Sequence, residues 1–259
     1  MTNLRILNAC WNCGIDDDSL AGLNLVKLKV DLNSKIKKIN HMKNLRILYA
    51  GGYSGIDDNS LAGLNLVELN ASKNPKIKKI NHMTNLRILN VSENCGIEDE
   101  DLEGLNLVEL KADSNKKIKK IDHMTTLRIL HARFDSTIGD DNLIGLNLVE
   151  LDVSHNPKIT KINHMTNLRI LDASGACAIG DDDIVGLNLV ELDAYNNPKI
   201  KKINHMTNLR ILNAGEGCGI GDGGIIGLNL VELNAKNNPK IKKINHMTNL
   251  RKLDGKYEL

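Results

Sequence analysis

A repeat of 41 residues dominates the sequence. All seven methionines follow this spacing, at Met1, Met42, Met83, Met124, Met165, Met206 and Met247. Segments such as INHMTNLRIL and GLNLVEL return at the same interval. Self-similarity at a fixed period of about 20 to 50 residues is typical of a solenoid, in which each repeat packs mainly on its neighbours. The repeat therefore decides the fold class before any local motif is considered.

Each block contains two related halves. The first half reads Leu86-x-x-Leu89-x-Val91-x-x-Asn94, and the second reads Leu148-x-x-Leu151-x-Val153-x-x-Asn156. The central apolar residues alternate at the two-residue period of a β-strand, which directs them into a core and the residues between them outward. We expect the strands of successive halves to stack as a parallel sheet, about 4.8 Å apart.

Both halves resemble the leucine-rich repeat, L-x-x-L-x-L-x-x-N/C-x-(x)-L/I, and the resemblance covers the whole chain. The first half is similar to the cysteine-containing subtype, and the second is similar to the internalin subtype with its N-x-x-I-x-x-I stretch. The resemblance implies an α/β fold: a right-handed leucine-rich repeat solenoid, shaped as a horseshoe or arc. Its parallel β-sheet would be concave, with short helices or 3-10 turns on the convex side.

We predict a single leucine-rich repeat domain over residues 1–259, with about 13 units. First halves start at Leu4, Leu45, Leu86, Leu127, Leu168, Leu209 and Leu250; second halves start at Leu25, Leu66, Leu107, Leu148, Leu189 and Leu230. The last unit is truncated and no N-terminal cap is recognisable, so we expect either a fragment or self-association through the N-terminal edge. Blocks this similar indicate recent tandem duplication or consensus design, and the double repeat resembles arrays in large DNA viruses.

Three columns of the repeat are predicted to be scaffold. Asparagines of the second halves should satisfy backbone groups where the strand turns away. Glycines that precede a core leucine should end the short helices at positive φ. Histidines, one per block, should form turn hydrogen bonds. The members are Asn33, Asn74, Asn115, Asn156, Asn197 and Asn238; Gly22, Gly63, Gly104, Gly145, Gly186 and Gly227; and His41, His82, His123, His164, His205 and His246.

Variation is confined to a few positions when each unit is numbered from its first leucine. Positions 5, 7 and 8 change in almost every unit, and we expect them to face outward on the concave sheet or its edge. Position 9 also varies in the first halves. All aromatic residues belong to this variable set: Trp11, Tyr49, Tyr53, Phe134, Tyr195 and Tyr257. Exposed aromatic side chains are common anchors of protein interfaces. The alternative is drift at tolerant surface positions, with no partner involved.

Two candidate contact sites follow from these positions. The central candidate combines position 5 of five successive units with neighbours at positions 7 and 8: Lys111, His131, Arg133, Phe134, Asp152, His155, Asp172, Asp193 and Tyr195. Three carboxylates about 5 Å apart favour a cationic or hydrogen-bond-donating partner. The alternative is a solvated acidic stripe balanced by nearby cations. The second candidate lies at the N-terminal end: Trp11, Lys29, Leu32 and Tyr49.

Composition narrows the function classes. The net charge of +2 argues against a nucleic acid or a membrane as partner. The five cysteines are expected to be unpaired, because those that share a column lie one block apart, about 10 Å, which is too far for a disulfide. Unpaired thiols are typical of a cytoplasmic, reducing location. The Cys10–Cys13 pair lacks the context of a redox or zinc motif, so no cofactor and no metal are predicted. Asp152, Ser154 and His155 have the residue types of a hydrolase triad but no pocket to support them.

The function predicted from the sequence is a non-enzymatic scaffold that binds a protein or peptide on its variable concave face. The alternative is a structural, consensus-designed or self-associating scaffold with no specific natural ligand. On the concave edge, Arg87 should lie between Glu68 and Glu109, which predicts an Arg–Glu ladder along the sheet. Acidic turns of the first halves and lysines of the second halves are expected to contribute mainly to solubility.

Overall fold

A computed structural model describes residues 3–255 of the chain. The chain divides into two compact units, Met1–Leu127 and Arg128–Leu259. Each predicted half-repeat contributes one strand, which begins two residues after its first leucine. The first unit contains β1 (Ile6–Asn8), β2 (Lys27–Lys29), β3 (Ile47–Tyr49), β4 (Glu68–Asn70), β5 (Ile88–Asn90) and β6 (Glu109–Lys111). The number of folding domains stays a prediction.

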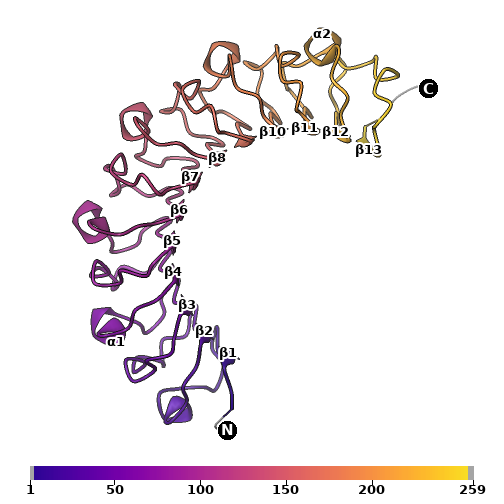
Figure 1. The fold of residues 1–259 in the computed structure, drawn as a ribbon. Coiled ribbons are helices and arrows are strands. Elements are labelled where there is room, and N and C mark those ends of the chain that lie inside the picture. Colours follow the sequence, from indigo (N-terminus) through magenta and orange to yellow (C-terminus); the bar gives the residue numbers. More distant parts are fainter. Residues whose placement is uncertain (1–2, 256–259) are drawn as a thin grey trace. The chain divides into compact units, whose positions relative to one another are not determined.

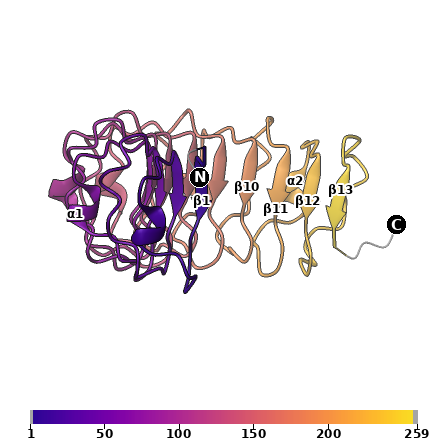
Figure 2. The ribbon, with the colours of Figure 1, turned by 90° about the horizontal axis from the view of Figure 1, so that it is seen from below.

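The second unit repeats this arrangement with β7 (Ile129–His131), β8 (Glu150–Asp152), β9 (Ile170–Asp172), β10 (Glu191–Asp193), β11 (Ile211–Asn213), β12 (Glu232–Asn234) and β13 (Lys252–Asp254). Within each unit the strands pair in chain order, and every pair is parallel, with central leucines opposite one another such as Leu28 with Leu48 and Leu171 with Leu192. Figure 2 shows β10 to β13 side by side. The parallel sheet predicted from the repeat is confirmed.

Short helices occupy the side of each unit opposite its strands, as α1 and α2 show in Figure 1. All of them belong to first halves: η1 (Asp18–Leu20), α1 (Asp58–Leu61) and η2 (Asp99–Leu102) in the first unit, and η3 (Asp140–Asn142), η4 (Asp181–Asp183) and α2 (Asp222–Ile225) in the second. The η segments are 3-10 helices. The prediction of short helices and 3-10 turns is therefore confirmed.

The core of each unit is aliphatic. Outside the first and last half-repeats, the leucines at positions 1 and 4 and the small residues at position 6 are buried; Leu86, Leu89 and Val91 are fully so. Isoleucines and methionines of the second halves, such as Ile159 and Met165, complete this interior. Burial of a leucine or isoleucine side chain stabilises a fold by about 1.5–3 kcal/mol, so the repeated apolar columns hold the solenoid together.

The asparagine column is scaffold, as predicted. The side-chain amide of Asn74 donates to the carbonyls of Ala50 and Ile56, at 2.9 and 3.1 Å. Asn156 is also fully buried and donates to Ala132 and Ile138, at 2.7 and 3.2 Å. Each amide thereby satisfies two carbonyl groups of the preceding half-repeat.

The histidine and glycine columns also take the predicted positions. In the second unit, the Nε2 atoms of His164 and His205 lie 3.3 Å from the carbonyl oxygens of Leu143 and Ile184. All six glycines of the column have positive φ, between 69° and 82°. This conformation is open to glycine at little steric cost, which explains why the column does not vary.

The acidic turns do more than keep the chain soluble. Oδ1 of Asp181 accepts the backbone N–H groups of Lys201 and Lys202, at 2.6 and 2.8 Å. Asp58 binds Lys78 and Lys79 in the same way in the first unit. One carboxylate per block therefore ties a first half to the second half that follows it.

The predicted Arg–Glu ladder is wrong. The Nη1 atom of Arg87 donates to the carbonyl oxygens of Thr84 and Leu86, at 3.0 and 2.9 Å, and not to a glutamate. Arg169 makes the equivalent two bonds in the second unit. The arginine stands just before the strand, so its guanidinium folds back over the turn that precedes it and satisfies two carbonyls there.

Candidate functional site

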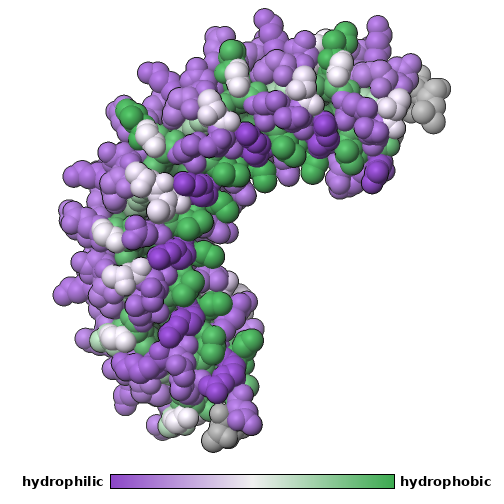
Figure 3. All heavy atoms as spheres, in the orientation of Figure 1, coloured by the Kyte–Doolittle hydropathy of each residue, from purple (hydrophilic) through white to green (hydrophobic). Residues whose placement is uncertain are grey.

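The exposed face of the sheet is built from positions 3 and 5 of each half-repeat, because positions 4 and 6 point into the core. Position 3 is isoleucine in every first half except the last, which has Lys252, and glutamate in most second halves. These residues oppose one another in register, as in Ile170 with Glu191. Figure 3 shows the resulting hydrophobic side chains along the strand-bearing side of each unit, among hydrophilic ones. Position 3 thus belongs to the candidate site, although it is not among the positions that vary most in the sequence.

In the second unit this exposed surface is strongly acidic. It carries seven carboxylates at positions 3 and 5, and we call six of them, all except Asp254 on the last strand, the acidic face: Glu150, Asp152, Asp172, Glu191, Asp193 and Glu232. Three of them are direct register neighbours at position 5, since Asp172 opposes Asp152 on one side and Asp193 on the other. A shallow hollow of about 200 Å³ lies over β8, β9 and β10 and is lined by these aspartates. The structure therefore brings together the three aspartates predicted from the sequence.

Burial and neighbouring charges raise the pKa of three carboxylates of the acidic face. Burial raises the pKa of Asp152, and the charge of Asp172 raises it further. Burial also raises the pKa of Asp193, to which the charges of Asp172 and Asp152 contribute. Glu191 follows the same pattern, with burial first and Glu150 next. Each shift means that the ionised form is less favourable in the folded protein than in water.

Each aspartate at position 5 also serves a turn. Oδ1 of Asp172 accepts the backbone N–H of Ser174 at 2.9 Å, and Oδ1 of Asp193 accepts that of Tyr195 at 2.8 Å. In the first unit Asn70 and Asn90 make the same bond, each at 3.0 Å to the N–H group two residues ahead. This Asx turn needs a side-chain oxygen and no charge.

A guanidinium and an imidazole side chain lie at one end of the acidic face. Arg133 Nε lies 3.5 Å from Oδ2 of Asp152, and His131 Nδ1 lies 3.7 Å from the same oxygen. The other ring nitrogen of His131 is 3.6 Å from Oε1 of Glu150. The predicted residues His131, Arg133 and Asp152 are therefore in contact, and the charge of Asp152 is partly compensated.

An aromatic edge borders the acidic face; we use this name for Phe134, His155 and Tyr195. The rings of Phe134 and His155 stack with centroids 5.4 Å apart and an interplanar angle of 12°. The Arg133 guanidinium lies 5.8 Å from the centroid of the Phe134 ring. Phe134 remains 45% exposed and Tyr195 39% exposed. The edge therefore offers aromatic surface beside the carboxylates.

The aromatic edge stands partly on an unusual backbone. Position 8 is left-handed throughout the described residues, with φ of 55° at Phe134, 58° at His155 and 66° at Gly175. A Cβ atom at Gly175 would lie 2.3 Å from the His155 ring, so the missing side chain makes room for the imidazole. The sequence shows no signal for this column, because only two of its twelve described members are glycine.

The N-terminal candidate is more dispersed. Trp11 is 70% exposed and Leu32 is 41% exposed, both at left-handed position 8. Two lysines of β2 contact Tyr49: the Nζ atoms of Lys27 and Lys29 are 5.3 and 4.7 Å from its ring centroid. Its hydroxyl donates to Glu68, and this bond, followed by burial, raises the pKa of Tyr49 to about 12. Tyr49 is therefore already engaged within its own unit.

The remaining predicted residues have simple surroundings. Lys111 on β6 pairs with Glu109 of the same strand, with Nζ and Oε1 3.1 Å apart. Tyr53 is 75% exposed at position 9. Tyr257 lies outside the described residues.

The residues that could suggest chemistry are arranged for other roles. The hydroxyl of Ser154 donates to Asp152 at 2.8 Å while His155 stacks on Phe134, so these three do not form a hydrolase triad. All five cysteines are free thiols. Burial raises the pKa of Cys177 and Cys218 to about 11, which disfavours the reactive thiolate. Within residues 3–255 no cluster of side chains is arranged to hold a metal ion, and no helix is long and apolar enough to cross a membrane.

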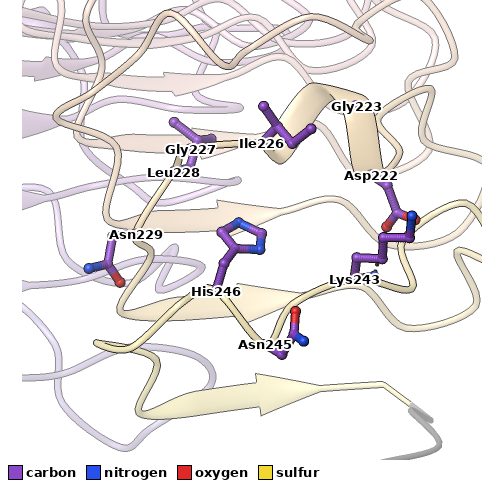
Figure 4. Close-up of a pocket in the computed structure, with 9 residues that line it drawn as sticks. All are labelled: Asp222, Gly223, Ile226, Gly227, Leu228, Asn229, Lys243, Asn245 and His246. Carbon is purple, nitrogen blue, oxygen red and sulfur yellow. Dashed lines mark hydrogen bonds between the residues drawn. The ribbon is translucent and has the colours of Figure 1, made fainter.

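A larger cavity of about 710 Å³ lies on the helical side of the last block (Figure 4). Its polar groups already serve the repeat: Asp222 accepts the N–H groups of Lys242 and Lys243, and His246 Nε2 lies 3.3 Å from the carbonyl of Ile225. The N–H groups of Lys242 and Lys243 lower the pKa of Asp222 accordingly. The same contacts recur in other blocks, so this cavity is a less specific candidate than the acidic face.

Comparison with known proteins identifies the fold. No family model and no curated protein matches the chain. Among solved structures, the internalin InlF of Listeria monocytogenes aligns at 22% identity and a TM-score of 0.58, over 92% of this chain and 75% of that one. TLR13 in its complex with ssRNA13 aligns at 17% identity and a TM-score of 0.55. Rad7 in the yeast Rad7–Elc1 complex aligns at 16% identity and a TM-score of 0.50. The TLR13 alignment covers 98% of this chain and 45% of that one, and the Rad7 alignment covers 97% of this chain and 81% of that one.

These likenesses show the fold alone, because every identity is below 25%. The fold is that of the leucine-rich repeat proteins, which confirms the resemblance seen in the sequence. Two of these structures are complexes, TLR13 with an RNA and Rad7 with Elc1. The expectation of no nucleic-acid partner gains no support, because the TLR13 structure is a complex with RNA.

Proposed function

We propose that this leucine-rich repeat chain is a non-enzymatic scaffold that holds a protein or peptide on the exposed sheet face of its second unit. The proposal is carried by one observation: an exposed, stacked aromatic pair, Phe134 and His155, stands beside a row of carboxylates. Aromatic anchors next to polar groups are the arrangement that dominates the binding energy of protein interfaces.

The backbone under this pair strengthens the proposal. A left-handed conformation is disfavoured by about 1–2 kcal/mol for a residue with a side chain, and glycine or asparagine accepts it more readily. Gly175 and Asn196 occupy the same column in neighbouring half-repeats. Phe134 is therefore a residue that this backbone does not favour, where glycine or asparagine would fit with less strain.

The shape of the surface favours an extended partner over a small molecule. The hollow over β8 to β10 is shallow and only about 200 Å³, while sites for drug-sized ligands usually enclose about 300–1,000 Å³. The strands beneath it are fixed in register by parallel pairing on both sides. A surface that is already rigid loses little conformational entropy when a partner binds.

The test is a selection of peptides from a displayed random library on the immobilised full chain, followed by affinity measurements on the recovered peptides. Phe134→Gly removes the aromatic ring, and glycine fits the left-handed backbone. Ile144→Ala is the matched control, because it removes an exposed apolar side chain on the helical side and Ala62 holds the equivalent position in another block. We expect Phe134→Gly to weaken binding at least about tenfold and Ile144→Ala to change it less than about twofold.

The alternative function is a scaffold without a specific ligand. It would be supported by a selection that recovers no peptide whose affinity depends on Phe134. The same result would contradict the binding function proposed here.

A further inference from the structure

Resting on the proposed function, we infer that the segment held on the acidic face is a basic, extended peptide. Its lysine or arginine side chains would reach Asp172 and Asp193, and its backbone would run across the strands beside the aromatic edge. The inference names the chemistry of the partner, which the fold itself does not determine.

The first step is that the repeat does not require these charges. Asn90 and Asn70 hold the positions equivalent to Asp172 and Asp193, and make the same turn bond. Two asparagines also fit side by side, because Asn70 opposes Asn90 in register. Asn213 and Asn234 form a second such pair within the second unit itself.

The second step concerns what compensates the charges. Asp152 has Arg133 and His131 beside it, and Glu232 pairs with Lys252 at 2.9 Å. The central pair differs: among the described residues, the hydrogen-bond donors to Asp172 and Asp193 are neutral. They are the backbone N–H of Ser174, the backbone N–H of Tyr195 and the side-chain amide of Asn213, at 2.8–2.9 Å. Charge complementarity therefore calls for a cation at this point of the sheet.

The third step is spacing. Neighbouring strands are about 4.8 Å apart, so the row from Asp152 to Asp193 spans about 10 Å. In an extended peptide, alternate side chains lie on one face about 6.6 Å apart, which places two flexible basic side chains within reach of this row. Ile170 and Ile211 on the same face offer apolar contact to the methylene groups of lysine or arginine.

The aromatic edge fits the same partner. Cations are attracted to aromatic faces within about 6 Å of the ring centroid. The Arg133 guanidinium already lies 5.8 Å from the Phe134 ring, and Phe134 keeps 45% of its surface exposed. A further basic side chain can therefore contact the edge while its neighbours meet the carboxylates.

The experiment measures binding of a fluorescein-labelled octapeptide of alternating lysine and threonine to the full chain by fluorescence anisotropy. The test variant is Asp172→Asn with Asp193→Asn. The control variant is Asp141→Asn with Asp182→Asn, which changes the net charge equally at exposed positions on the helical side, where Asn59 occurs in an equivalent block. Circular dichroism and thermal unfolding check that both variants fold.

We expect the test variant to raise the Kd at least about tenfold and the control variant to raise it less than about twofold. Raising the salt concentration from about 50 to about 500 mM should weaken binding to the native chain, because exposed charges are screened. A twin peptide with glutamate in place of lysine should not bind. Equal effects of the two variants, or binding that ignores both, would overturn the inference.

The peptide selection separates this inference from the proposed function. Recovered peptides that depend on Phe134 and contain no basic residues would keep the function and refute the basic partner. Recovered peptides that depend on neither Phe134 nor the two aspartates would refute both.

Discussion

The same turn is built with different residues in the two units. Asn70 and Asn90 of the first unit and Asp172 and Asp193 of the second unit accept the same backbone N–H group at nearly the same distance. The two asparagines show what this turn bond needs, which is an oxygen atom. The second unit adds a charge to that oxygen, and the difference therefore points to function and not to folding.

The two units also differ at position 8, the left-handed column. In the first unit Lys73 and Glu93 occupy position 8 and form an exposed ion pair, with Nζ and Oε1 3.0 Å apart. In the second unit Phe134 and His155 occupy this position and stack. An exposed ion pair contributes little to stability, about 0.2–1 kcal/mol, whereas exposed stacked rings provide an apolar contact surface.

The largest expected effect tests whether the two units share one scaffold. Asn156→Ala and Asn74→Ala each leave two carbonyl groups of the preceding half-repeat without their amide donor. We expect each variant to lose roughly 2–4 kcal/mol of unfolding free energy. Urea unfolding followed by circular dichroism measures both losses. A large loss at only one of them would contradict a common scaffold.

Gly175→Ala should have the next largest effect. The alanine would have to keep the φ of 66° that Gly175 has. Its Cβ atom would lie 2.3 Å from the His155 ring, which would have to move. We expect a loss of about 2 kcal/mol, against about 1 kcal/mol for Gly186→Ala, where φ is also positive and the space is open. Thermal unfolding compares the two. Equal losses would mean that the ring moves away at no cost and that the stack is not held in place.

Exchanging the residues of position 5 between the units should change the free energy of unfolding by less, and Asp172→Asn should raise it where the two preceding substitutions lower it. Asp172→Asn removes two directly opposed like-charge pairs, each worth about 0.2–1 kcal/mol, and should stabilise the fold. Asn90→Asp should be close to neutral, because its register neighbours are Asn70 and Lys111. Destabilisation by Asp172→Asn, measured in urea, would show that the carboxylate has a structural role.

The pH dependence gives the smallest effect. Because the pKa of Asp152 and of Asp193 is raised above the ordinary 3.8, their ionisation destabilises the folded state. This loss is complete above the raised pKa values and disappears as the pH falls below 3.8. Asp172→Asn should lower both pKa values, which NMR titration of the side-chain carboxyl carbons measures. Its stabilising effect should therefore be smaller at about pH 3 than at pH 7.

Much of this fold could be predicted from the sequence, because the core obeys simple periodicities. The two-residue alternation of Leu89 and Val91 identifies a strand, and the invariant glycines and asparagines mark its turns. The aspartate row could be predicted for the same reason: residues at one position of successive units must share one row of a parallel sheet. Asp152, Asp172 and Asp193 are found in this row.

Other features could not be predicted because they depend on backbone geometry and side-chain direction. The left-handed conformation of Phe134 leaves no mark in the sequence, since most residues of that column are not glycine. The guanidinium of Arg87 folds back to the carbonyl oxygen of Thr84 in the preceding turn and does not reach Glu68, and this side-chain direction cannot be read from the sequence. The turn role of Asp172 becomes visible only when its oxygen is seen beside Ser174.

The most direct test of the binding surface is an NMR titration of the isotope-labelled chain with the alternating lysine–threonine octapeptide. We expect the largest amide shifts at residues 152–155, 172–175 and 193–196, where the aspartates meet the edge of the sheet. Shifts confined to the first unit or to the helical segments of the second, with these three stretches unmoved, would contradict recognition by the acidic face.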